Sequence, residues 1–192
     1  ELYSSDSYRI HGLASDQKSV DNARQYIINQ GKYGNVTVEE WNKENLPYID
    51  NLVNLLIVRK SYNVPMKEFM RVLAPNGVLF MQNGDKWIKK KKEWPDNIDE
   101  WGHHFHGANN NAVSHDTRVG PPRHLQWVGN PLYARSHELN SSIPAMVTSG
   151  GRIFYILDEG PIGMKDPRLP SEWKLIARNG FNGVKLWNRN LE

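Results

Sequence analysis

Apolar positions recur with two different periods over the first 82 residues. Residues 8–13 form a short apolar-leaning run typical of a strand, and the apolar positions of residues 17–30 recur at helical spacing. Val36 and Val38 alternate with polar residues, whereas residues 52–58 are nearly all apolar and suit a strand that is covered on both faces. Strands that alternate with helices predict an α/β domain built on a parallel sheet.

A second helix and a further strand complete this predicted domain. Pro65 is a favourable residue for the start of a helix, and the turn residues Pro75, Asn76 and Gly77 mark its end. Residues 78–81 then predict a buried strand. The helix has one apolar face, made by Met66, Phe69, Met70 and Leu73.

The last third of the chain shows the alternation of an antiparallel sheet. Its four short strand-like runs, separated by turns, are residues 144–148, 152–157, 173–178 and 184–188. Four strands in a meander form one blade of a β-propeller. A single blade leaves edges and an apolar face exposed. The pattern therefore predicts further blades, in the same protein or in a partner chain.

The residues between these two regions predict a linker. Residues 83–98 are polar and rich in lysine, with Gly84 and Pro95 as turn residues. The predicted organisation is an α/β domain at residues 1–82, a linker at residues 83–98, and a propeller entry segment with a first blade at residues 99–192.

Composition excludes several classes of function. The chain has 24 basic and 21 acidic residues and a net charge of +3. The lysine run at residues 89–92 is therefore interpreted as a solvated linker, and no nucleic-acid partner is predicted. The chain has no cysteine, which excludes disulfides and thiolate metal ligands. No stretch reaches the roughly 18 consecutive apolar residues of a membrane span.

The first region resembles a known enzyme family. Leu46, Pro47 and Tyr48, together with the run Glu-Phe-Met-Arg-Val-Leu-Ala-Pro-Asn-Gly at residues 68–77, are similar to the second half of class I S-adenosylmethionine-dependent methyltransferases. The resemblance covers residues 8–82. It implies a partial Rossmann-like sheet and S-adenosylmethionine as a cofactor.

The resemblance also implies where that cofactor would bind. In the family a glycine-rich turn after the first strand holds the donor, and an acidic residue at the end of the second strand binds its ribose. This chain resembles a fragment that begins just before that second strand. The acidic position falls on Ala14, and Asp16 lies two residues further on. Trp41 stands where an adenine contact is expected, with packing in the core as the alternative.

The last region resembles the quinoprotein propellers, which are built from PQQ-like repeats. The resemblance rests on residues 147–154, a hairpin with a glycine turn, and residues 176–187, a strand pattern that ends in tryptophan. Asn179 stands at the family's aspartate position, a change that weakens a turn hydrogen bond. The resemblance implies that Trp187 docks between neighbouring blades, and it adds PQQ to the implied cofactors.

Four histidines lie close together in the segment that joins the two regions. Imidazole and carboxylate groups are good ligands for a divalent metal, so His103, His106, His115 and Asp116 are candidate metal ligands. The alternative is an entry loop of the propeller, in which the Asp-Glu-Trp run at residues 99–101 ties the loop to the blade.

The combination of the two regions resembles large multidomain proteins of planctomycetes and related bacteria, which implies a periplasmic or cell-surface location. Two classes of function follow. In the first, a degenerate, non-catalytic methyltransferase-like module is fused to a ligand- or partner-binding propeller. In the second, the protein is an enzyme, either a methyltransferase whose donor motif lies upstream or an oxidoreductase that uses PQQ or a metal. The sequence leaves open whether the protein is an enzyme.

Overall fold

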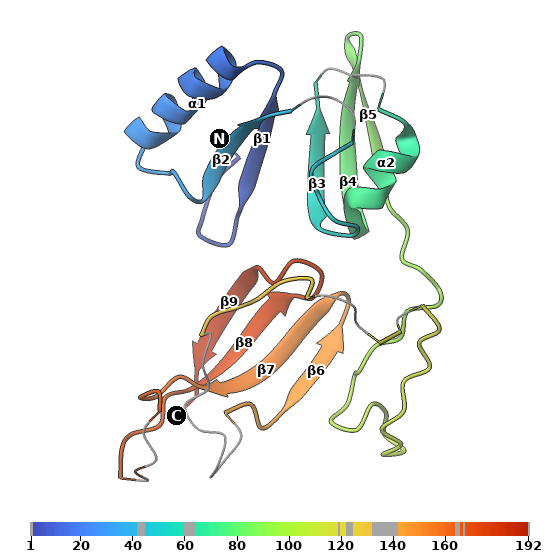
Figure 1. Cartoon of the computed structure of the whole chain (residues 1–192). Coiled ribbons are helices and arrows are strands. Elements are labelled where there is room, and N and C mark those ends of the chain that lie inside the picture. The colour runs from blue at the N-terminus through green and yellow to red at the C-terminus, as the bar shows by residue number, and fades with distance from the viewer. Residues whose placement is uncertain are drawn as a thin grey trace. The chain divides into compact units, whose positions relative to one another are not determined.

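The computed structural model describes residues 2–41, 45–59, 64–118, 120–121, 125–131, 142–163, 166 and 168–191. Within these residues it contains two helices and nine strands, drawn in Figure 1. The chain divides into two compact units, Glu1–Trp94 and Pro95–Glu192, called unit 1 and unit 2 below. No helix in the described part of the chain is long and apolar enough to cross a membrane.

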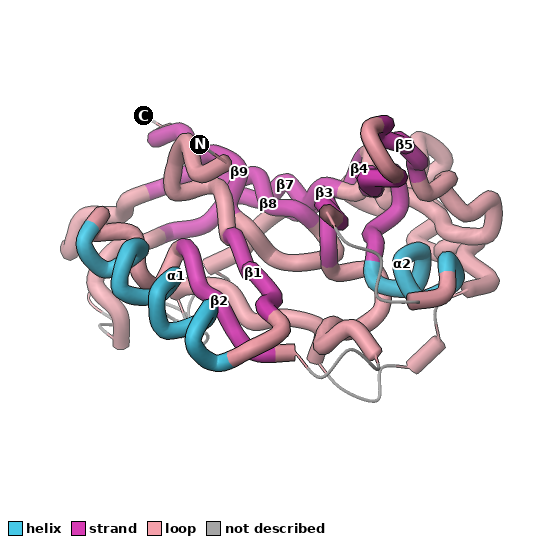
Figure 2. The backbone as a smooth tube through the Cα atoms, turned by 90° about the horizontal axis from the view of Figure 1, so that it is seen from above, coloured by secondary structure: helices cyan, strands magenta, loops and turns pink. Residues whose placement is uncertain are grey.

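Unit 1 begins with a parallel pair of strands and the helix that connects them. β1 (Ile10–Ala14) and β2 (Val36–Glu40) are joined by α1 (Gln17–Asn29). α1 begins after Asp16, whose carboxylate accepts hydrogen bonds from the backbone N–H and the hydroxyl of Ser19, both at 2.9 Å. Figures 1 and 2 both show α1 lying along one side of the strand pair.

The rest of unit 1 is a three-stranded sheet with one helix. β3 (Val53–Val58) lies parallel to β4 (Leu73–Asn83), and α2 (Met66–Val72) connects them. β5 (Lys86–Lys91) returns antiparallel to β4 after a tight turn at Gly84, where φ is 61°. The strand order is therefore β3-β4-β5.

The core of unit 1 lies where α2 packs on this sheet. Leu13 of β1 packs against the same residues, so one core links both sheets. Its buried members come from α2, β4 and neighbouring loops: Trp41, Leu46, Val64, Phe69, Val72, Leu73 and Leu79. Each large apolar side chain buried in this way contributes about 1.5–3 kcal/mol to stability.

A buried ion pair fixes the loop that precedes β3. Glu68 accepts a hydrogen bond from the backbone N–H of Leu46 at 2.9 Å and pairs with Arg71 at 2.7 Å. Arg71 also donates to the carboxylate of Asp50 and to the backbone carbonyl of Tyr48, both at 2.8 Å. These contacts hold the loop against α2, and they occupy the residues on which the methyltransferase resemblance rests.

Unit 2 contains a four-stranded antiparallel meander. Its strands follow one another across the sheet, and β8 is the most buried of them. They are β6 (Met146–Ser149), β7 (Arg152–Asp158), β8 (Trp173–Asn179) and β9 (Lys185–Asn190).

The turn between β8 and β9 is held by Asn179. Its side-chain oxygen accepts backbone hydrogen bonds from Phe181 at 2.9 Å and from Asn182 at 3.2 Å. A neutral amide makes weaker bonds of this kind than a carboxylate does. The asparagine therefore keeps the turn that an aspartate would make.

The segment that carries Trp127 packs on one end of this sheet. The indole lies against Gly183, where an added Cβ would overlap the ring, and its N–H donates to the carbonyl of Gly180 at 2.9 Å. The buried Arg178 donates to the carbonyls of Gly183 and Asn130 at 2.8 and 2.7 Å. One aromatic ring and one guanidinium thus attach an irregular segment to the strands.

The predicted fold class, a partial Rossmann-like α/β sheet followed by the first blade of a β-propeller, is wrong. In the part of the chain that the structure describes, strands are far more abundant than helices, and they form three separate small sheets beside two helices. β1 pairs with β2 alone, so the parallel pairs do not form one sheet. The sheet of unit 2 has no second sheet of its kind among these residues. Parallel pairs with a connecting helix and antiparallel meanders are local motifs shared by many folds.

Individual elements were predicted better than their arrangement. Each predicted helix and strand is present, but α2 ends at Val72, so Leu73 of the expected helical face is instead the first residue of β4. The turn expected at residues 75–77 lies inside β4, where the register with β3 is irregular. Most of the predicted linker belongs to unit 1, because residues 86–91 form β5. The expectation that β3 is covered on both faces is wrong, since it is an edge strand in which Leu55 is 49% and Ile57 40% exposed.

Replacement of Gly183 by Ala tests the packing of Trp127. We expect it to lower the free energy of unfolding of unit 2 by about 2–4 kcal/mol, because φ is 71° and the new Cβ overlaps the indole. Denaturation of the full chain followed by near-ultraviolet circular dichroism measures this loss. Gly102→Ala is the matched control, since nothing lies within 4 Å of its Cβ. An equal loss of unfolding free energy in Gly183→Ala and Gly102→Ala would contradict the packing of Trp127 on Gly183.

Candidate functional site

The polar centre of the segment that enters unit 2 is the carboxylate of Asp99. Its Oδ2 lies 2.6 Å from Nε2 of His106 and accepts the backbone N–H of His115, also at 2.6 Å. The hydroxyl of Ser114 donates to the same oxygen at 3.3 Å, and the N–H of Glu100 donates to Oδ1 at 2.8 Å. Four groups, from the adjacent Glu100, from His106 and from the pair Ser114 and His115, therefore meet on one side chain.

His106 is enclosed by aromatic rings. Its side chain is 11% exposed, and its ring meets those of Trp101 and His115 edge-on, with centroids 5.2 Å apart in each case. Its backbone has a φ of 69°, and its N–H donates to the carbonyl of His103 at 3.0 Å. The imidazole is held by its carboxylate partner, by packing and by the backbone, so it is a fixed group.

Two neighbours of Asp99 fasten the segment to the sheet. The N–H of Trp101 donates to Oγ1 of Thr148 at 2.7 Å, and the N–H of Thr148 donates to the carbonyl of Trp101 at 2.8 Å. Glu100 accepts the N–H of Gly150 in the turn between β6 and β7. The segment thereby covers part of the outer edge of β6. This geometry matches the entry-loop alternative, in which residues 99–101 tie the loop to the strands.

The predicted metal ligands do not converge on one point. His103, His106, His115 and Asp116 are all described, and no three His, Asp or Glu side chains in the described ranges are grouped to hold a metal ion. Nε2 of His106 is bonded to Asp99, and the carboxylate of Asp116 accepts a backbone N–H of its own turn at 2.7 Å. As they lie, these residues do not fit a metal ion.

The two residues proposed for S-adenosylmethionine also fill structural roles. Asp16 caps α1, and both of its carboxylate oxygens bond to Ser19. Trp41 is buried in the core of unit 1 and donates its indole N–H to the carbonyl of Asn45 at 2.9 Å. Neither side chain as placed fits a contact with the cofactor, and the packing alternative for Trp41 describes what the structure contains.

A second polar contact connects β1 to the loop before β3. The hydroxyl of Tyr48 lies 3.0 Å from Nδ1 of His11, and the two rings meet edge-on. Burial, and then the charge of Glu39, raise the pKa of Tyr48 to about 12, so the phenol stays protonated near neutral pH. Nε2 of His11 is buried without a hydrogen-bond partner, 3.7 Å from Glu39. The contact helps to hold the two sheets of unit 1 together.

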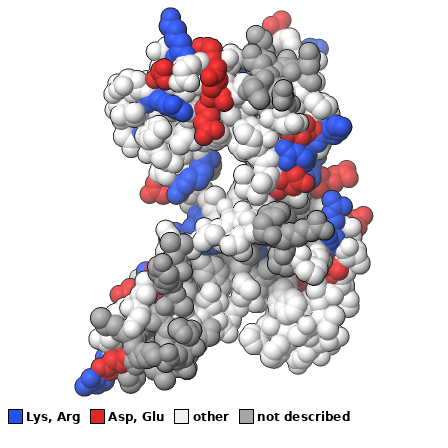
Figure 3. Space-filling model, viewed as in Figure 1, with Lys and Arg blue, Asp and Glu red and all other residues white. Residues whose placement is uncertain are grey.

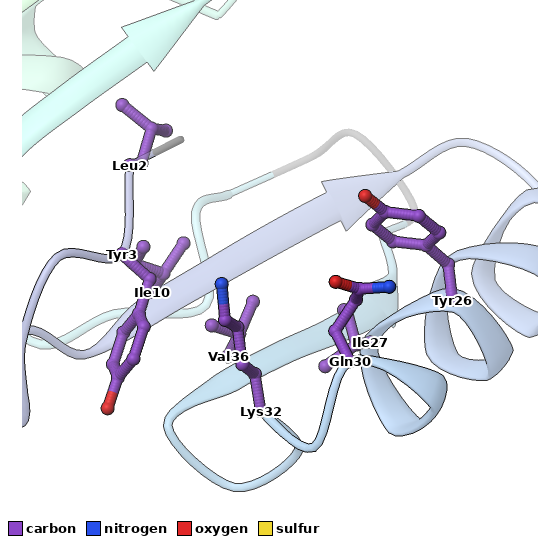
Figure 4. Close-up of a pocket in the computed structure, with 8 residues that line it drawn as sticks. All are labelled: Leu2, Tyr3, Ile10, Tyr26, Ile27, Gln30, Lys32 and Val36. Atoms are coloured by element: carbon purple, nitrogen blue, oxygen red, sulfur yellow. The ribbon is translucent and has the colours of Figure 1, made fainter.

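A small pocket lies between α1 and the β1–β2 pair, shown in Figure 4. Its volume is about 240 Å³, below the roughly 300–1,000 Å³ of sites for drug-sized ligands. A pocket of this size admits a small group and not an extended cofactor. It is lined by Leu2, Tyr3, Ile10, Tyr26, Ile27, Gln30, Lys32 and Val36.

The lysine run at residues 89–92 is divided between two roles. Lys92 points inward, where its ammonium donates to the side chain of Asn51 and to the carbonyl of Leu73, both at 2.7 Å. The other three lysines are exposed on β5. Figure 3 shows blue and red side chains intermixed on the face that it draws. A broad basic surface of the kind that binds nucleic acids is not seen on that face.

The sequence indicated Asp99 only as part of the run 99–101 that ties the entry loop, and not as the centre of its hydrogen bonds. Two of the groups that it accepts are backbone N–H groups, which no side-chain pattern marks. An exposed apolar face was expected for the four-stranded sheet of the last region, but not for the sheet of unit 1. The residues of β5 carry no signal for that face, since Trp87 and Ile88 are adjacent and four lysines follow, with no alternation of apolar and polar residues.

Comparisons with known proteins give little guidance. No protein-family model matches the sequence, and no curated protein matches it. Among solved structures, three chains match, and one of them is the [4+2]-cyclase SpnF. The match has 25% sequence identity and a TM-score of 0.36, and it covers 38% of this chain and 29% of the SpnF chain. A TM-score this low supports no conclusion on fold or function.

The hydrogen bonds of Asp99 predict a dependence of stability on pH. The N–H of His115 first, and His106 next, lower the pKa of Asp99 to about 2 from 3.8. A carboxylate with a lowered folded-state pKa stabilises the fold at higher pH, and this contribution is lost as the pH falls from about 4 to about 2. We expect the melting temperature of unit 2 to fall over that range.

Substitution of this carboxylate gives the direct test. We expect Asp99→Asn to lower the melting temperature at pH 7 and to flatten its dependence on pH, because an amide cannot accept all four bonds. Circular dichroism melts at a series of pH values measure both effects. Asp96→Asn is the matched control, an exposed carboxylate in the same segment. If the melting temperature of Asp99→Asn changed with pH as steeply as that of the wild type, Asp99 would not be the source of the pH dependence.

Proposed function

We propose that this chain is a partner-binding module, in which one face of the sheet of unit 2 packs against an apolar surface of its partner. This proposal keeps the binding class of function and sets aside the enzyme class. The observation that carries it is a continuous row of apolar side chains across all four strands.

The strand register defines that face. Antiparallel partners share a side of the sheet. Val147 pairs with Phe154, Phe154 with Ala177, and Ala177 with Trp187, so these side chains form one row from β6 to β9. Ile156 and Leu175 form a second row beside it. These six residues are called the Trp187 face: Val147, Phe154, Ile156, Leu175, Ala177 and Trp187.

Each face of the sheet has buried and exposed positions: Ala177 on the Trp187 face is fully buried, and Met146 on the opposite face is 52% exposed. The opposite face carries Arg178, which bonds to the segment of Trp127. On the Trp187 face, Trp187 is 41% exposed, and its ring centroid lies 6.0 Å from that of Phe154. The guanidinium of Arg189 also lies 6.0 Å from the Trp187 ring. Exposed tryptophan beside arginine on an apolar surface is typical of protein interfaces.

The alternative functions have less support in the geometry. The carboxylate of Asp99 is saturated by bonds that hold its own segment, and the candidate residues for a metal or for S-adenosylmethionine have structural roles. Use of PQQ and a periplasmic or cell-surface location stay predictions of the resemblance.

The purified full chain provides the test. Without a partner, we expect the Trp187 face to bind a hydrophobic dye and to pair weakly with a second copy, because apolar area leaves water in both cases. Trp187→Ser should reduce the dye fluorescence and shift sedimentation towards the monomer. Sedimentation velocity from about 5 to about 200 μM covers the range of weak association.

Phe105→Ser is the matched control. Phe105 is also an exposed aromatic residue of unit 2, 47% exposed, but it lies in the entry segment and not on the sheet. We expect this variant to keep the dye binding and association of the wild type. If both variants behave alike, or if the wild type neither binds dye nor associates, the Trp187 face is not a binding surface.

A further inference from the structure

The sheet of unit 1 has an exposed face of its own, which does not depend on the Trp187 face. Along β3 and β4, Leu55 lies beside Val78 and Ile57 beside Phe80. Across β4 and β5, Val78 opposes Lys91, Phe80 opposes Lys89, and Gln82 opposes Trp87. These eight residues are called the outer face: Leu55, Ile57, Val78, Phe80, Gln82, Trp87, Lys89 and Lys91.

Burial shows that this side of the sheet lacks the cover that the other side has. The alternate positions on β4, such as Leu79, are buried under α2. On the outer face, Leu55, Ile57 and Trp87 are 49%, 40% and 48% exposed, and the residues between them are half-buried. A contiguous exposed apolar area of this kind marks an interaction site more often than chance.

The charged residues of the outer face all lie on β5. Lys89 and Lys91 follow each other along β5, and the ammonium of Lys89 lies 5.6 Å from the centroid of the Phe80 ring. No carboxylate of the described residues pairs with either lysine. The apolar strip over β3 and β4 is therefore bordered by a row of cations on β5.

We propose that the outer face binds an amphipathic helix of a protein partner, with acidic residues along one flank of that helix. A helix packs on a sheet by laying its apolar stripe over one face. Its stripe would cover Leu55, Ile57 and Phe80, and its acidic flank would lie over Lys89 and Lys91. Trp87 at the end of the strip gives the aromatic anchor that such interfaces use.

The helix α1 of a second copy does not supply such an acidic flank. α1 has exposed apolar residues, Tyr26 and Ile28, but it carries one acidic residue, Asp21, beside the basic residues Lys18 and Arg24. Its charge therefore does not complement the lysines of β5. The charge pattern favours a different protein with an acidic flank.

Two synthetic peptides test the proposal on the full chain. Both are 18-residue helices with one leucine stripe, and they differ only in one flank, which carries four glutamates in the first and four lysines in the second. Isothermal titration calorimetry should show the acidic peptide binding at least about tenfold more tightly than the basic one. Ile57→Ser should lower the affinity for the acidic peptide by about tenfold or more, since it removes apolar contact.

Neighbouring lysines give the matched control. Lys89→Glu should lower the affinity for the acidic peptide about tenfold, whereas Lys90→Glu should change that affinity less than about twofold. Lys90 opposes Leu79 in the register, so it belongs to the other side of the same strand. Trp187→Ser should leave peptide binding unchanged, which separates this proposal from the one for unit 2.

Several outcomes would overturn the proposal. They are equal affinity for the two peptides, no binding of either, and equal effects of Lys89→Glu and Lys90→Glu. A further outcome is that the chain associates with itself, and that both the acidic peptide and Ile57→Ser abolish this association. That result would show that a second copy occupies the outer face instead. Circular dichroism of each variant ensures that a lost signal is not a lost fold.

Discussion

A β-sheet presents side chains on two faces, and apolar side chains on each of them need cover. This constraint governs both units of the chain. In unit 1, α2 buries Leu79, while the next residue along β4, Phe80, stays half-buried on the other side. In unit 2, Arg178 bonds to the segment of Trp127 on one side, and Trp187 is exposed on the other. The uncovered sides are where binding is proposed.

The irregular segments that pack on the sheets are held in place by a few charged side chains. Irregular segments lack the regular backbone hydrogen bonds of a sheet, so a charged side chain that makes several hydrogen bonds holds them instead. Arg71 with Glu68 performs this role in unit 1, and Arg178 and Asp99 perform it in unit 2. The same bonds explain why His106 is a fixed packing group, although a histidine-rich segment is a natural candidate for a metal site.

The sequence predicted local structure well because periodicity is a local property. The apolar run at residues 153–157 and the apolar helical positions after Pro65 each depend on a few neighbouring residues. Arrangement was predicted poorly, since it depends on which strands pair. Nothing local shows that β3 lies at a sheet edge, or that Pro75 lies in a bulge within β4. The bonds of Asp99 were not predicted for a related reason, because three of its four partners, in His106, Ser114 and His115, lie 7–16 residues away along the chain.

Hydroxyl-radical footprinting of the tryptophans in the dilute full chain tests the central claim most directly, because residues of one chemical type share one intrinsic reactivity. The account predicts that Trp87 and Trp187, 48% and 41% exposed, are oxidised several times faster than Trp41, which is 9% exposed. Protection of Trp87 and Trp187 equal to that of Trp41 would contradict it, since both faces would then be covered within the chain itself.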